Sequence, residues 1–296
     1  MTSASILSPD SALFQALQHA ALERRCVFFA GLPGVGKSLL LQQLALLATE
    51  RGRSVSLLQW DVARGPFETP ELLARYPEAD GVTHPVIRKA VGMWARGAVA
   101  AWHRQHPDSR AILIGEVPLI GNRLIELVQR QDDAAEPLLS EDGTLFLIPV
   151  PSRAVRQVIE AARVREMAAP SHERERANAV PSLVHALWEE LAAVAGALGI
   201  GPVASTPPAT DACAQAHRGF DPDLYAAVYQ ALLRHRHAAL LHVTSPLPVQ
   251  TSVYDALGVA RDLVPGPDAV AHSMATVTAR PQAEIAQEVE DWFRVS

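Results

Sequence analysis

The stretch Gly31-Leu32-Pro33-Gly34-Val35-Gly36-Lys37-Ser38 decides the fold of this chain. It follows the pattern G-x-x-x-x-G-K-S/T, a glycine-rich loop whose backbone N–H groups surround phosphate between a strand and a helix. Residues 26–30 form a short apolar run typical of a buried parallel strand, and apolar residues recur at helical spacing over residues 39–48. The motif and its surroundings agree, so the chain is predicted to bind a nucleotide.

Individual residues of this loop are expected to contact different parts of a triphosphate. Lys37 would reach the β- and γ-phosphates, and the Ser38 hydroxyl would bind Mg²⁺, which prefers oxygen ligands. Lys37 is one of only two lysines among the 26 basic residues, so a general preference for lysine does not explain its position. The expected cofactor contacts are Gly31, Pro33, Gly34, Val35, Gly36, Lys37, Ser38 and Leu39.

Length and composition favour a globular protein without a membrane segment. The 296 residues are 49% hydrophobic, which is ample for a sizeable core, and we expect a single domain over residues 1–296. The longest apolar runs are too short to span a bilayer, and the N-terminal residues lack the pattern of a secretory signal. The two cysteines give neither metal spacing nor a disulfide framework. A cytoplasmic monomer or homodimer is expected.

The formal net charge of −6 argues against binding nucleic acid over the whole surface. A local basic channel stays open as an alternative. Nucleic acid is therefore not the expected partner of this chain.

Alternating strand and helix patterns predict an α/β fold with three αβα layers and a five-stranded parallel sheet. The predicted strands cover residues 26–30, 54–60, 111–117, 144–150 and 239–244. The predicted helices cover residues 11–23, 39–48, 85–102, 122–130, 181–198, 222–236 and 280–293. Residues 152–180 are rich in arginine and glutamate, and we expect them to form a helical, lid-like insertion in the domain.

This layout resembles the P-loop kinases of nucleotides and small metabolites. Neither lysine lies in an Asn-Lys-x-Asp guanine motif, and the Leu-Ser-Gly-Gly-Gln signature of transporters is missing from the sequence. In the kinase family a substrate-binding segment follows the second strand and an arginine-rich lid follows the fourth, as they do here. The resemblance covers most of the chain as a layout but is specific only at residues 31–38.

The resemblance implies an enzyme that uses ATP and Mg²⁺ to phosphorylate a small acceptor such as a nucleoside, nucleotide or sugar-like metabolite. Asp61 and Arg64 are similar to the Asp-x-x-Arg of adenylylsulfate kinase, which implies a base and a substrate anchor. Glu116 ends the third strand, where the family carries an acidic residue for the Mg²⁺ shell. The family more often has Asp there, so two roles stay open for Glu116: it could orient water on Mg²⁺, or it could activate the nucleophile. A turn cap at Asp61 and a helix-terminus contact at Glu116 are the structural alternatives.

Arginines are expected to complete the site, because phosphoryl transfer spreads negative charge over the transferred oxygens. We expect Arg153 and Arg156 of the lid to act in catalysis, and Arg88, Arg123 and Arg163 to bind the substrate together with Arg64. Each could instead be a surface partner of a nearby glutamate, as Arg156 could be of Glu160.

Two other functions remain open at this point. A nucleotide-binding regulator or scaffold would keep the loop without turning over an acceptor. A nucleic-acid-dependent kinase or ATPase would need a positive path for the strand.

Overall fold

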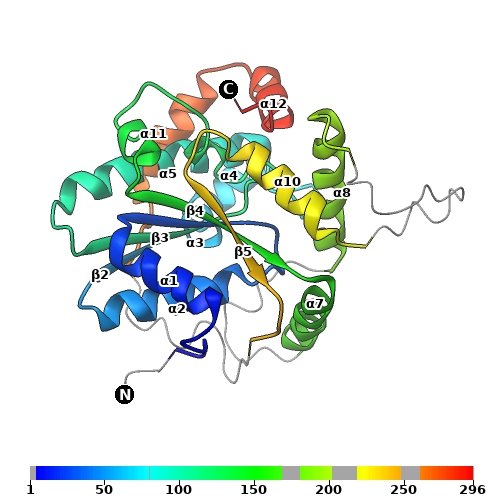
Figure 1. The fold of residues 1–296 in the computed structure, drawn as a ribbon. Coiled ribbons are helices and arrows are strands. Elements are labelled where there is room, and N and C mark those ends of the chain that lie inside the picture. The colour runs from blue at the N-terminus through cyan, green and yellow to red at the C-terminus, as the bar shows by residue number, and fades with distance from the viewer. Residues whose placement is uncertain (1–4, 80, 169–180, 202–218, 248–260, 296) are drawn as a thin grey trace, which may run out of the picture.

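The five predicted strands form one parallel sheet in a computed structural model that describes residues 5–79, 81–168, 181–201, 219–247 and 261–295. The strands are β1 (Cys26–Ala30), β2 (Ser54–Gln59), β3 (Ala111–Val117), β4 (Thr144–Pro151) and β5 (Ala238–Val243). A two-residue strand, β6 (Arg261–Asp262), adds to the edge beside β2 and gives the order β5-β4-β1-β3-β2-β6 (Figure 1). The predicted fold class is confirmed.

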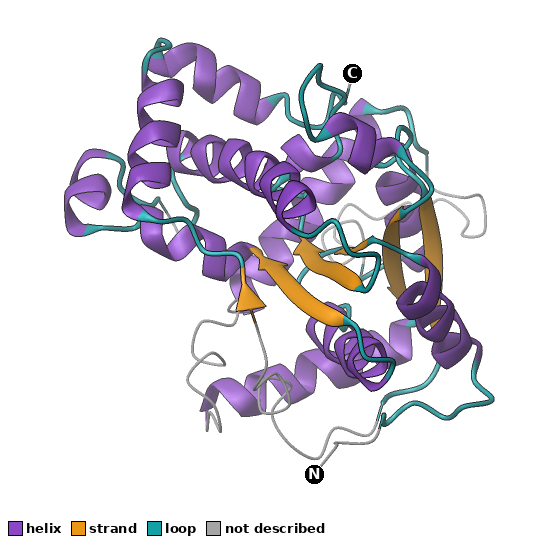
Figure 2. Cartoon of the chain, turned by 90° about the vertical axis from the view of Figure 1, so that its left-hand side faces the viewer, coloured by secondary structure: helices purple, strands orange, loops and turns teal. Residues whose placement is uncertain are grey.

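Helices cover both faces of the sheet, as Figures 1 and 2 show. On one side, α1 (Ala12–Glu23) and α2 (Lys37–Glu50) pack on Val27 and Phe29 of β1. Phe28 points to the opposite face, because successive side chains of a strand alternate. The second core is formed with α5 (Pro85–Gln105), α8 (Pro181–Ala197), α10 (Pro222–Leu232) and α11 (Pro267–Thr278). The result is the predicted three-layer arrangement.

Shorter elements complete the fold. They are α3 (Trp60–Arg64), the 3-10 turn η1 (Gly65–Phe67), α4 (Pro70–Arg75), η2 (Ile125–Leu127), α6 (Glu136–Ser140), α7 (Arg153–Ala168) and α12 (Gln282–Glu290). Several helices begin at a proline, as predicted, because its fixed φ suits the first helical position. Among the described helices, none is both long and apolar enough to cross a membrane.

The helix predicted over residues 122–130 is wrong. Only the three-residue turn η2 forms there, and three residues nearby have φ in the left-handed region: Leu119, Asn122 and Leu124. Three carbonyls of this segment, those of Glu126, Leu127 and Gln129, are bound by arginine side chains. Arg96 Nη1 donates to the oxygens of Glu126 and Gln129, and Arg236 Nε donates to that of Leu127. Contacts from distant helices thus replace the local hydrogen bonds that the sequence pattern indicated.

Helix α7 occupies the first part of the predicted lid at residues 152–180. Residues 169–180 lie outside the described residues, as does the Arg163 side chain and most of the loop after β5.

The strand order places a ligand-binding edge at the end of β1. The chain leaves β1 toward β2 on one side and leaves β4 toward β5 on the other. In open parallel sheets, ligands bind outside the carboxyl ends of the strands where the connections diverge in this way. The glycine-rich loop follows β1 directly, so the sequence motif and the topology indicate the same edge.

Candidate functional site

The glycine-rich loop between β1 and α2 has the conformation of an anion site. Gly34 and Gly36 have φ of 80° and 89°, in the region that favours glycine. Helix α2 begins at Lys37, and no side chain caps its N-terminus at Gly36. Its first turn contains no acidic residue. The backbone N–H groups of this turn and the positive end of the helix dipole suit phosphate oxygens.

Glu116 brings the two polar residues of the loop together. Its Oε1 lies 3.3 Å from Lys37 Nζ, and its Oε2 accepts a hydrogen bond of 3.2 Å from Ser38 Oγ. Lys37 is buried, and its Nζ also donates to the Leu32 carbonyl at 2.9 Å. The strand register explains the contact, since Glu116 on β3 pairs with Phe29 on β1. The predicted acidic residue therefore lies against the lysine and serine of the loop.

Ser38 and Glu116 fit a Mg²⁺ site that is completed by a bound nucleotide. Mg²⁺ takes oxygen ligands, usually one or two carboxylates together with phosphate oxygens and water. Among the described residues, no three or more His, Cys, Asp and Glu side chains form a group that could hold a metal ion. Phosphate would therefore have to supply part of the coordination.

Asp61 lies at the same charged centre but on another element, the short helix α3 after β2. Its Oδ1 is 3.7 Å from Arg64 Nη2, and its side chain is 65% exposed. The surrounding protein raises the pKa of Asp61, and the charge of Glu116 raises it further, while Arg64, Arg123 and Lys37 oppose both effects. A carboxylate that is accessible and has a raised pKa suits a general base.

Three predicted substrate-binding arginines come from three parts of the chain, and the charges of two of them, Arg64 and Arg123, act on Asp61. Arg64 follows β2 and donates to Glu68 at 2.6 Å, and Arg88 on α5 donates to the Gly121 carbonyl at 2.7 Å. The Arg123 side chain makes no hydrogen bond or ion pair within the described residues, although Glu190 and Asp61 act on it through their charges. The pKa of Arg123 is lowered by burial and by the neighbouring positive charges of Arg88 and Arg64, opposed by those carboxylates.

Some donor atoms of these arginines have no partner. Nε of Arg64 and Nε of Arg88 are buried without a hydrogen bond to any described residue. Buried polar atoms in proteins are almost always hydrogen-bonded, and arginine binds carboxylate and phosphate groups well. The arrangement thus favours an anionic group beside Asp61.

Glu190 is a member of this cluster that the sequence did not indicate. It lies on α8, accepts a hydrogen bond of 3.2 Å from Trp292 Nε1, and faces Arg123 and Arg88. Burial raises the pKa of Glu190, whereas these partners lower it. Nothing in the local pattern distinguishes it from Glu189, because its position depends on how α8 packs.

The two lid arginines expected in catalysis lie in different surroundings. Arg156 on α7 is 3% exposed, donates to Glu160 at 2.6 Å and stacks over Phe220. Its Nη1 atom is buried with no hydrogen-bond partner in the described part of the chain. Arg153 is exposed and binds Asp221 at the start of α10. The structure therefore brings Arg156, and not Arg153, to the inner surface beside the loop.

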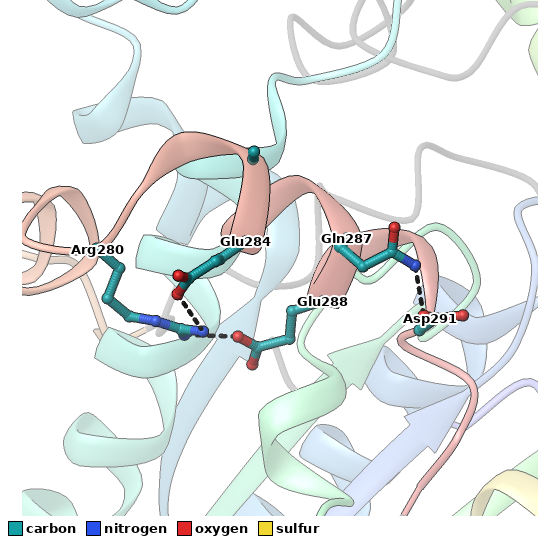
Figure 3. A pocket seen from close by; sticks show the side chains of 6 residues that line it. Arg280, Glu284, Gln287, Glu288 and Asp291 are labelled. Carbon is teal, nitrogen blue, oxygen red and sulfur yellow. Dashed lines mark hydrogen bonds and ion pairs between the residues drawn. The ribbon is translucent and has the colours of Figure 1, made fainter.

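An open depression also lies along α12 (Figure 3). Arg280 Nη1 binds Glu288 Oε2 at 2.6 Å, and Gln287 Nε2 donates to Asp291 at 2.6 Å. Because these polar side chains pair with one another, the edge at β1 is the stronger candidate. No family model, curated protein or solved structure matches this chain, so the interpretation of its site depends on the residues described above.

Proposed function

We propose that the protein is a Mg²⁺-dependent P-loop kinase of the cytoplasm that transfers the γ-phosphoryl group of ATP to a hydroxyl or phosphate of a small acceptor. The observation that supports this best is the contact of Glu116 with both Lys37 and Ser38, beside the accessible carboxylate of Asp61. A site that only bound nucleotide would not need a second carboxylate facing the same centre.

Bound ATP and Mg²⁺ would supply the transferable phosphoryl group and neutralise its charge. Lys37 would leave the Leu32 carbonyl and bind phosphate oxygens, and Ser38 and Glu116 would hold the metal and its water. Asp61 would accept the proton of the attacking hydroxyl.

Some of the arginines would bind the acceptor, and another would bind the phosphoryl group that ATP donates. Arg123 and Arg88 would hold an anionic part of the acceptor, since the charge of Arg123 acts on Asp61 and on Arg88, and Nε of Arg88 is buried without a hydrogen bond to a described residue. Arg156 would stabilise charge on the transferred group from the side of α7. An acceptor with a phosphate or carboxylate group is therefore favoured over a neutral one.

The test is Mg²⁺-dependent ATP consumption with nucleosides, nucleotides, sugars, sugar phosphates and short oligonucleotides as acceptors. We expect stimulation by one small acceptor, lost on chelation of Mg²⁺. Asp61→Asn should lower turnover by about 10²- to 10⁴-fold with ATP binding retained, whereas Lys37→Ala should remove ATP binding. Asp142→Asn, an exposed carboxylate before β4, is the matched control and should change neither.

If ATP binds through Lys37 but no acceptor stimulates turnover, a regulatory nucleotide-binding role replaces this proposal. Stimulation by oligonucleotides that falls steeply with salt would indicate a nucleic-acid-dependent enzyme.

A further inference from the structure

Tyr225 on α10 makes a close approach to the first glycine of the loop. It is fully buried, and its ring packs against Tyr229 and Phe220 at centroid distances of 4.7 and 5.3 Å. A methyl group at Gly31 would collide with Tyr225 Oη and would lie 2.8 Å from Val35 Cγ2. The φ of Gly31 is outside the left-handed region, unlike that of Gly34 and Gly36. Gly31 is thus required by the tyrosine hydroxyl and not by backbone conformation.

The Tyr225 hydroxyl has no hydrogen-bond partner among the described residues. The Leu32 N–H lies near this hydroxyl but does not have the geometry of a hydrogen bond to it. Burial raises the pKa of Tyr225, and the Arg156 charge and the Leu32 amide oppose this effect. A fully buried hydroxyl without a partner is unfavourable, which suggests that its partner forms in another state of the protein.

Tyr229, one helical turn later, provides the contrast. It is equally buried, but its hydroxyl donates to the Pro118 carbonyl at 2.7 Å, just after Glu116 on β3. Helix α10 therefore contacts both loops of the candidate nucleotide site through tyrosine hydroxyls. The Tyr229 hydroxyl has a hydrogen-bond partner there, whereas the Tyr225 hydroxyl has none among the described residues.

The Leu32 peptide unit connects Tyr225 to Lys37. The Leu32 carbonyl accepts the hydrogen bond from Lys37 Nζ, while its N–H lies on the side of Tyr225. If Lys37 moves to phosphate oxygens, this carbonyl loses its donor and the peptide unit is released to tilt. A small rotation of the Leu32 peptide unit would align its N–H with the Tyr225 hydroxyl oxygen.

We propose that Tyr225 is a positioning residue of the glycine-rich loop, whose hydroxyl accepts a hydrogen bond from the Leu32 N–H when nucleotide fills the loop. The proposal rests on the nucleotide binding of the proposed function but not on phosphoryl transfer. It acts through the loop, so it concerns any nucleotide whose phosphates engage Lys37.

Tyr225→Phe and its matched control Tyr229→Phe test this, with thermal unfolding without ligand and calorimetric binding of Mg²⁺-ADP and Mg²⁺-ATP. Tyr225→Phe should unfold at the wild-type temperature or above it, because the removed oxygen had no partner. Its affinity for ADP and for ATP should fall by the same factor, between about 2- and 12-fold, the value of one hydrogen bond. Tyr229→Phe should unfold at a lower temperature and keep nucleotide affinity within about twofold, because its bond to Pro118 does not depend on ligand.

Unchanged affinity in Tyr225→Phe overturns the proposal, as does a loss of stability without nucleotide that equals the loss in Tyr229→Phe. A loss confined to ATP also overturns it, because that result would mean direct contact with the γ-phosphate. Gly31→Ala gives a second route: it should weaken nucleotide binding, and adding Tyr225→Phe should recover part of the affinity by making room for the methyl group. No recovery contradicts the close approach.

The outcomes separate this inference from the kinase proposal. Wild-type protein that binds ADP and ATP but phosphorylates no acceptor removes the kinase activity and leaves the role of Tyr225 to be decided by these variants. Wild-type protein that binds neither nucleotide overturns both.

Discussion

Two groups of buried or half-buried arginines in this protein differ in how completely their donors are paired. The anchor cluster consists of Arg96 and Arg236 with Asp133 and Glu136; the edge cluster consists of Arg64, Arg88, Arg123 and Arg156. In the anchor cluster, Arg96 binds Asp133 and Glu136 at 2.6 Å each, and Arg236 binds Glu136 at 2.8 Å. In the edge cluster, buried nitrogens of Arg64, Arg88 and Arg156 have no partner among the residues that the structure describes.

The difference shows that burial of an arginine is not by itself a sign of function. The anchor arginines replace helical hydrogen bonds in residues 122–130, and their pairing leaves nothing for a ligand to add. Single unpaired atoms also occur elsewhere, as at Trp102 Nε1. An unpaired donor indicates a ligand only where it lies beside an accessible carboxylate, as the Arg64 guanidinium lies beside Asp61.

The carboxylates of the two clusters titrate in opposite directions. Although burial raises it, hydrogen bonds from Arg236 and Arg96 hold the pKa of Glu136 well below its usual range. Near the edge cluster, the surrounding protein and the charge of Glu116 raise the pKa of Asp61, although its carboxylate is accessible. Hydrogen bonds from arginines favour the charged form of Glu136, and that form stabilises the fold. Asp61 has fewer such partners, and its raised pKa suits a group that accepts a proton.

The largest expected effect is on the anchor cluster. Arg236→Met should lower the free energy of unfolding by about 3–5 kcal/mol, because the Leu127 and Gln129 carbonyls lose a buried donor and Glu136 keeps only one of its two arginines. Urea unfolding measures this. Arg110→Met, an exposed arginine paired with Asp108, is the control and should stay within about 0.5 kcal/mol. If Arg236→Met is as stable as the control, the anchor cluster does not hold residues 122–130.

The next effect separates the edge cluster from the anchor cluster. Arg123→Met should leave stability within about 1 kcal/mol, because it has no hydrogen bond in the described structure to lose. The KM for an anionic acceptor should rise about 10- to 100-fold, the value of a hydrogen bond to a charged group. Acceptor kinetics and urea unfolding of the same protein measure both. A stability loss like that of Arg236→Met would erase the distinction between the clusters.

The pH dependence of stability tests the pairing of Glu136 in the anchor cluster. Because its pKa is lower in the folded protein, its contribution to stability is complete above the ordinary glutamate value of 4.5 and is lost as pH falls below it. At pH 7 the free energy of unfolding of wild type should therefore exceed that of Glu136→Gln by on the order of 2 kcal/mol. This difference should shrink as the pH falls toward 3. Unfolding of both proteins across this range gives the difference. A constant gap would mean that Glu136 does not titrate between the two states.

The smallest effect concerns the two lid arginines. Arg153→Met should leave both stability and nucleotide affinity unchanged within about 0.5 kcal/mol, because its contact with Asp221 is exposed. Arg156→Met should lower turnover, because its unpaired Nη1 lies on the buried side of α7. Steady-state kinetics of the pair decide between them, and a larger loss in Arg153→Met would reverse the assignment.

Local sequence patterns predicted much of this fold. The strands at residues 26–30 and 111–117 lie where apolar runs placed them, and helices begin at Pro85, Pro181 and Pro222 as predicted. Proline geometry and alternating burial act within a few residues, so the chain itself reveals them. The helix at residues 122–130 was predicted wrongly because carbonyls of this segment are bound by side chains from α5 and from the turn between α10 and β5.

By itself, the sequence determined the glycine-rich loop, the strands and helices around it, and the residue types available for phosphate and metal. Only the tertiary structure decided that Glu116 meets Lys37 and Ser38, that Glu190 joins the edge cluster, and that Tyr225 rests against Gly31. The physical reason is the distance along the chain over which each kind of interaction acts. Propensity and periodicity act between neighbours along the chain, whereas ion pairs and close approaches depend on strand register and helix packing between segments far apart in sequence.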